Sequence, residues 1–166
     1  MIVYISEQSS RFEYEEVDQE TFEEALLDLA TLDLEDDQVG YPNFDKLSQS
    51  YLTGGRGYDL YMLRKDDLPS SGPFEIMITN DKDDEPIGFI RGTKRENIIS
   101  FNLIHIMDEH RGYGIGSDIY IKLLNDGNII KSDDEITDAT YSLYKNLSKK
   151  YTTLLFNDGS VGLKKA

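Results

Sequence analysis

Residues 104–116 read Ile104-His105-Ile106-Met107-Asp108-Glu109-His110-Arg111-Gly112-Tyr113-Gly114-Ile115-Gly116. The largely apolar segment that leads into them predicts a strand over residues 98–107 that is buried on both faces. Three glycines then interrupt the pattern, and the apolar residues that follow recur at helical spacing: Ile115, Ile119, Leu123 and Leu124. The segment therefore predicts a strand, a glycine-rich turn and a helix in direct succession.

A turn of this kind forms an anion site. The N–H groups at the start of a helix have no acceptor inside the helix, the helix dipole makes that end positive, and glycines let a phosphate come close to the backbone. We expect a pyrophosphate as the ligand. The dinucleotide-binding pattern G-x-G-x-x-G is excluded, because it fails at Asp118 and Ile119 and the preceding strands form a meander instead of βαβ units.

The same residues resemble the signature strand, turn and helix of the GNAT acetyltransferases, whose pattern is Q/R-x-x-G-x-G/A. Arg111, Gly114 and Gly116 occupy its fixed positions, and Gly112 follows the arginine as it does in many members. The resemblance implies that the cofactor is acetyl-CoA and that its pyrophosphate is held by the amides of Arg111, Gly112, Tyr113, Gly114, Ile115 and Gly116. It also implies that the backbone of Ile106 and Met107 binds the pantetheine arm.

Two further side chains receive candidate catalytic roles. The helix segment Thr140-Tyr141-Ser142-Leu143-Tyr144 is similar to the family's A-x-x-L-Y helix, whose tyrosine often protonates the departing CoA thiolate. Tyr144 is therefore the candidate general acid, and it also fits an apolar helix face, because a tyrosine can bury its ring and direct its hydroxyl into a site. No glutamate stands on the strand 98–107, where several relatives carry one. His105 on that strand is the candidate general base, since histidine titrates near neutral pH, although a lone strand histidine also commonly packs in a core.

The remaining sequence predicts the elements around this turn. An acidic stretch over residues 13–37 contains a helix whose apolar stripe is Phe22, Ala25, Leu26, Leu29 and Ala30. Residues 43–57 read as a short helix followed by flexible glycines, either a binding loop or a plain connector. Strands follow over 58–63, 74–79 and 86–91, and the helix after the turn ends at Gly127. A strand from Asn128 to Lys131 comes next, then a helix opened by an S-x-x-E capping box at Ser132 and a closing hairpin over 151–163.

We therefore expect one domain over residues 1–166 with an α/β fold, an α+β mixed sheet that is mostly antiparallel and flanked by helices. By resemblance this is the GNAT fold, with a splay between the strand that ends at Met107 and the strand that begins at Asn128. The segment Ser132-Asp133-Asp134-Glu135-Ile136-Thr137 stands where the family usually continues its fifth strand and then places an Asn. With Gly127 ahead of it, this form resembles GNAT-type proteins encoded by bacteriophages.

Composition limits the partners. Asp and Glu number 32 against 17 Lys and Arg, which leaves a formal net charge of -15. Such a field repels nucleic acid and anionic membranes, and it attracts an amine-bearing or basic acceptor. The chain has no cysteine and only two histidines, so we expect no disulfide and no metal site. Without a signal peptide or a membrane-spanning apolar run, we expect a cytoplasmic monomer or homodimer, located in the host cytoplasm if a phage encodes it.

The resemblance implies an acetyl-CoA-dependent N-acetyltransferase that moves an acetyl group to an amine of a small molecule or a protein. The alternative is a catalytically silent GNAT-fold phage protein, an acidic mimic of DNA that inhibits or binds a host protein. The net charge, the phage-like segment and the missing glutamate favour the alternative. The three glycines of one turn favour catalysis, because a decoy has no physical need for them.

Overall fold

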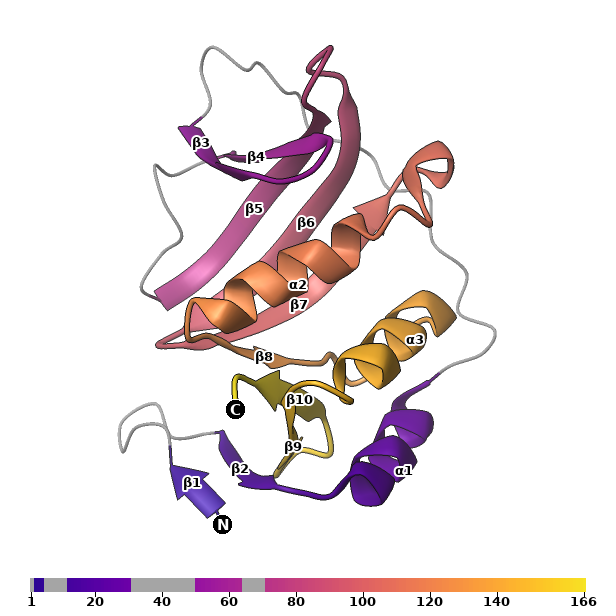
Figure 1. Ribbon diagram of the computed structural model, residues 1–166. Helices are drawn as coiled ribbons and strands as arrows, with labels where there is room; N and C mark the ends of the chain where they lie inside the picture. The colour runs from indigo at the N-terminus through magenta and orange to yellow at the C-terminus, as the bar shows by residue number, and fades with distance from the viewer. Residues whose placement is uncertain (1, 5–11, 31–49, 64–70) are drawn as a thin grey trace. The chain divides into compact units, whose positions relative to one another are not determined.

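The computed structural model describes residues 2–4, 12–30, 50–63 and 71–166, which Figure 1 draws in colour. The chain forms two compact units. One unit consists of Asp37–Ile121, and the other consists of Met1–Asp36 together with Lys122–Ala166. Each unit is built on antiparallel strands with helices beside them. No helix in the described part of the chain is long and apolar enough to cross a membrane.

The first of these units is an antiparallel meander. Its strands are β3 (Ser50–Gly54), β4 (Tyr58–Met62), β5 (Ser71–Asn80), β6 (Pro86–Arg95) and β7 (Ile98–Ile106), and each pairs with the next along the chain. The register places Ile76 opposite Ile90 and Ile90 opposite Ile104, so branched apolar side chains share one face of three strands. This local, in-order pairing is the meander that the sequence predicts.

A bulge interrupts β7 halfway along. Arg91 pairs with Leu103 and Gly92 with Phe101, which leaves Asn102 as the extra residue of β7. A Cβ atom on Gly92 would lie 2.6 Å from the carbonyl oxygen of Ser100, so only glycine fits beside the bulge. The helix α2 (Ile115–Asn125) follows β7 and begins in the same unit, where the Tyr120 ring packs on Phe101 with 5.0 Å between ring centroids.

The other unit joins the two ends of the chain. Its strands lie in the order β1 (Ile2–Tyr4), β2 (Glu13–Glu16), β9 (Thr152–Phe156), β10 (Val161–Lys164) and β8 (Ile129–Lys131), all paired antiparallel. Two helices accompany them, α1 (Gln19–Leu29) and α3 (Asp138–Leu147). The helix α1 buries Phe22 and Leu26, and the Gln19 side chain donates a 2.6 Å hydrogen bond to Ser148 just after α3.

Several sequence predictions are confirmed. The fold is α/β with a mostly antiparallel arrangement of strands, and strands occur over the predicted segments 58–63, 74–79, 86–91 and 98–107. Gly127 ends α2 in the left-handed conformation at φ 95°, where the N–H of Asn128 donates to the carbonyl of Leu123. The closing hairpin is present as β9 and β10.

The predicted capping box at Ser132 is wrong. Ser132 continues the pairing of β8 with β10: its N–H donates to the Val161 carbonyl at 2.8 Å, and its Oγ accepts from the Val161 N–H at 3.0 Å. The helix α3 begins at Asp138, and its N-cap is Thr137, whose side chain accepts from the N–H of Thr140. Because both polar groups of Ser132 are used by the strand, none is left to start a helix.

In the N-terminal half of the chain one further prediction differs from the structure, and one strand was not predicted. The short helix expected within 43–57 is a strand over its described part, since β3 occupies Ser50–Gly54; residues 43–49 lie outside the described residues. The strand β2 was not predicted, because the sequence showed only acidic residues before the helix; its Tyr14 is buried against Phe156 with 5.4 Å between ring centroids. The single domain over 1–166 stays a prediction. The splay between β7 and β8 also stays a prediction, because the two strands belong to different units.

Candidate cofactor-binding site

The predicted strand, the turn and the start of the helix lie within one unit. The pairing of β7 with β6 extends to the N–H of Met107, which donates to the Ile87 carbonyl at 2.9 Å. A short 3-10 helix (Asp108–His110) follows, and α2 then begins at Ile115. The structure therefore confirms the succession and adds one tight helical turn that the sequence did not reveal.

Two glycines of the turn are required by the backbone. Gly112 has φ 86° and Gly114 has φ 80°, a left-handed conformation that L-amino acids adopt only at an energetic cost. A Cβ atom on either residue would meet no other atom within 4 Å, so the space beside both is open. Gly116 differs, because its Cβ would make ordinary contacts of 3.8 and 3.9 Å with Ile106 and Ile104. An alanine fits that position, as the Gly/Ala choice in the resemblance pattern allows.

Free backbone donors gather at the start of α2. The first bond of the helix runs from the N–H of Asp118 to the carbonyl of Gly114 at 2.9 Å. The N–H groups of residues 115–117 therefore have no acceptor inside the helix. Together with the open space at Gly112 and Gly114, these donors make the turn suitable for an anion.

Arg111 is engaged within the turn. Its Nε donates to the Ile106 carbonyl at 2.6 Å, its guanidinium lies 3.1 Å from the Asp108 carboxylate, and its backbone N–H donates to the Asp108 carbonyl at 3.2 Å. These contacts give Arg111 a part in shaping the turn. The backbone N–H of Arg111 was predicted to bind the pyrophosphate, and this stays a prediction. In this structure that N–H donates to the Asp108 carbonyl.

The backbone of Ile106 faces the side of β7 that points away from β6. Because the N–H of Met107 points to β6, strand alternation directs the N–H and carbonyl of Ile106 away from β6. That is the side on which the resemblance places the pantetheine arm, although the Ile106 carbonyl already accepts one bond from Arg111. His105 pairs with Phe89 and is half-buried, and Tyr113 is 79% exposed on the turn.

A buried tyrosine that the sequence analysis did not select contacts this turn. Tyr58 of β4 is 1% exposed, and its hydroxyl donates a hydrogen bond to the carboxylate of Asp118 in the first turn of α2. Burial, and then the neighbouring Asp118 carboxylate, raise the pKa of Tyr58 above its usual range, because both disfavour the phenolate. The sequence carries no local signal for this contact, because Tyr58 and Asp118 lie 60 positions apart.

Tyr144 lies in the other unit. It is 1% exposed on α3, and Leu147 on the same helix is also buried. The helix face on which the sequence placed Tyr144 is therefore a buried face. The acid role stays a prediction, and it requires the Tyr144 hydroxyl to lie within hydrogen-bonding reach of the thiolate that it protonates.

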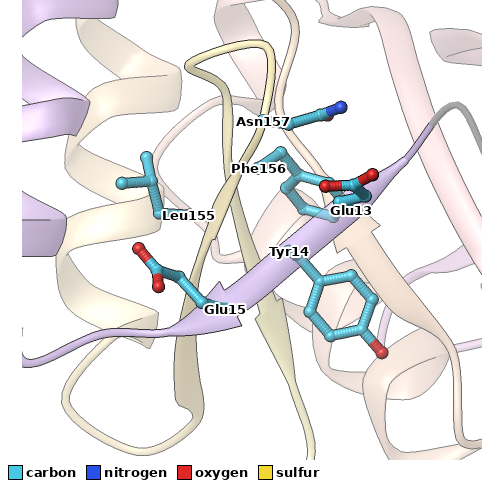
Figure 2. A pocket seen from close by; sticks show the side chains of 6 residues that line it. All are labelled: Glu13, Tyr14, Glu15, Leu155, Phe156 and Asn157. Carbon is cyan, nitrogen blue, oxygen red and sulfur yellow. The ribbon is translucent and has the colours of Figure 1, made fainter. Parts of the chain in front are cut away.

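A shallow hollow on the unit that contains Tyr144 is not the predicted cofactor site (Figure 2). Its lining residues are Glu13, Tyr14, Glu15, Leu155, Phe156 and Asn157. None of the predicted site residues is among them. The two glutamates make this hollow a poor receptor for a pyrophosphate, because like charges repel.

Comparison with known proteins gives distant likenesses in structure. No protein-family model matches the sequence, and no curated protein matches it. The chain is similar to a cAMP-binding acyltransferase from Mycobacterium smegmatis, with 10% identity and a TM-score of 0.42 over 71% of this chain and 47% of that one. It is also similar to a Klebsiella pneumoniae protein assigned to the acyl-CoA N-acyltransferases, with 19% identity and a TM-score of 0.40 over 62% and 78% of the two chains.

A tandem GNAT protein from the clavulanic acid biosynthesis pathway is a further likeness, with 7% identity and a TM-score of 0.37. The match covers 48% of this chain and spans 29% of the tandem protein's length. Likenesses at these TM-scores carry no argument about activity. None of them supports the expected resemblance to phage-encoded proteins.

Proposed function

We propose that this chain is a GNAT-type acyltransferase that binds acetyl-CoA at the turn before α2 and transfers the acetyl group to an amine. One observation carries the proposal: Gly112 and Gly114 adopt left-handed conformations beside open space at the start of a helix. Neither glycine is needed to relieve a contact inside the protein. Their conformation and position suit the close approach of a phosphate to the N–H groups of residues 115–117.

The proposed reaction forms a carbon–nitrogen bond and breaks the thioester carbon–sulfur bond. A neutral amine attacks the carbonyl, which backbone N–H groups on the side of β7 away from β6 polarise. His105 accepts the proton that the amine loses, and Tyr144 donates a proton to the departing thiolate. The acid role of Tyr144 comes from the resemblance, whereas the base role of His105 comes from its residue type and its place on β7. The two residues belong to different units.

Calorimetric titration with acetyl-CoA tests the proposal. We expect binding by the parent protein and a loss of affinity of more than about tenfold in Gly114→Glu, because the new side chain enters the space proposed for the phosphates and adds a negative charge. Gly127→Glu is the matched control, since Gly127 also has a left-handed φ of 95° with nothing within 4 Å of its Cβ. It carries the same strain, volume and charge at the other end of α2. Equal affinities in the two variants would place the phosphates elsewhere.

A second candidate is the binding of a basic protein surface. The observation in its favour is a row of exposed carboxylates at helical spacing on α1, formed by Glu20, Glu24 and Asp28. Glu15 and Glu16 of the adjoining β2 are exposed as well. This surface adds to the net charge of -15 and suits a partner rich in Lys and Arg.

A further inference from the structure

The glycine pair between β3 and β4 has a packing role. The N–H of Gly55 donates to the Tyr58 carbonyl at 2.9 Å, and a Cβ atom on Gly55 would overlap the Tyr58 ring. The glycine therefore lets the ring lie flat against the turn. Tyr58 is thereby fixed in the core at the first position of β4, where it pairs with Asn80.

From this position Tyr58 reaches α2. Its hydroxyl donates to Oδ2 of Asp118, the residue whose own N–H closes the first turn of the helix on Gly114. Burial raises the pKa of the Tyr58 hydroxyl, so it remains a donor at neutral pH. One hydrogen bond therefore links the sheet to the first turn of the proposed phosphate site.

The Asp118 carboxylate would oppose an anionic ligand if it were not held. Carboxylates near the start of a helix are attracted to its unpaired N–H groups, which are the donors that a pyrophosphate needs. The negative charge of Asp118 would also repel the ligand, in a chain whose formal net charge is already -15. Tyr58 occupies Oδ2 of this carboxylate from the sheet side.

We propose that Tyr58 is a positioning residue of the acyl-CoA site, which holds the Asp118 carboxylate so that it does not compete for the N–H groups of residues 115–117. The proposal rests on the proposed function. It assigns a specific role to a tyrosine that touches neither the ligand nor the reacting atoms. If Tyr58 has this role, the effect of removing its hydroxyl on acetyl-CoA affinity should depend on the charge of Asp118 and not on packing alone.

The test is a cycle of Tyr58→Phe, Asp118→Asn and the double variant, titrated with acetyl-CoA at one ionic strength. Tyr61→Phe is the matched control, because Tyr61 is another buried tyrosine of β4. We expect Tyr58→Phe to weaken binding about tenfold more than the control does. The double variant should recover to within about threefold of the parent, because asparagine carries no charge.

The outcomes separate the two hypotheses. A parent protein that does not bind acetyl-CoA overturns the proposed function and this inference with it. A parent that binds, with Tyr58→Phe unchanged or with the double variant as weak as Tyr58→Phe, overturns only the inference. If Tyr58→Phe does not fold, Asp118→Asn alone decides: it should bind acetyl-CoA at least as tightly as the parent, and weaker binding would refute the role.

Discussion

Lys131 is a buried cation whose partners come from both ends of the chain. It is 7% exposed in β8, its Nζ lies 2.8 Å from the Asp158 carboxylate, and it stands over the rings of Phe12 and Phe156 at 4.9 and 5.3 Å. The apolar pattern predicts the strand but not the burial of its lysine. The partners lie far away in sequence, at both ends of the chain, and no local spacing reveals them.

Asp158 should make stability depend on pH. Burial alone would raise its pKa, but hydrogen bonds from Lys131 and Ser160 outweigh burial and lower the pKa below the ordinary value of 3.8. The folded protein therefore binds this proton less tightly than the unfolded chain does. The stabilisation is present above the ordinary pKa and is lost as the pH falls through the lowered one.

We expect Asp158→Asn to reduce the free energy of unfolding by about 1–2 kcal/mol at neutral pH, because it leaves the buried Lys131 without a counter-charge. The loss should shrink well below pH 4, where the parent also loses the charge. Urea unfolding at both pH values measures the difference. Asp126→Asn, at an exposed position, is the control and should have little effect at either pH. An equal loss for Asp158→Asn at both pH values would contradict the electrostatic explanation.

At the scale of elements, the sequence predicted what local chemistry determines. The turn between β7 and α2 was predicted because its strand, glycines and helix are contiguous. The start of α3 was not, because Ser132 and Thr137 both suit a helix cap and only pairing with β10 distinguishes them. Tyr58 was missed for the same reason, since its contact with Asp118 joins residues 60 positions apart.

Alanine variants should separate the two residues at the start of α3. Thr137→Ala removes the N-cap and should cost about 1 kcal/mol of stability, with faster hydrogen exchange at the Thr140 amide. Ser132→Ala leaves the Val161 N–H without its Oγ acceptor and should speed exchange there instead. Amide exchange followed by NMR measures both. If exchange at the Thr140 amide became faster in Ser132→Ala and stayed unchanged in Thr137→Ala, the result would support the capping box at Ser132 after all.

For the whole molecule, the class of fold followed from the sequence, and the arrangement of its ends did not. The meander from β4 to β7 is local in sequence, whereas β2 pairs with β9 across most of the chain. The acidic composition obscured β2, because its glutamates read as one charged stretch with α1. That composition also leaves two functions to separate, catalysis on a cationic acceptor and binding of a basic partner.

Tyr144→Phe decides between these functions, because it keeps the buried ring and removes only the hydroxyl. If Tyr144 is the general acid, turnover should fall by about 10²- to 10⁴-fold while acetyl-CoA affinity stays near the parent value. Thiol release with polyamines, Lys peptides and basic proteins as acceptors measures this, and Tyr141→Phe on the same helix is the control.

Full turnover in Tyr144→Phe would remove Tyr144 from the mechanism. Absence of turnover on every amine, with partner binding abolished by charge reversal at Glu20, Glu24 and Asp28, would favour the binding protein, because only that function depends on the acidic face of α1.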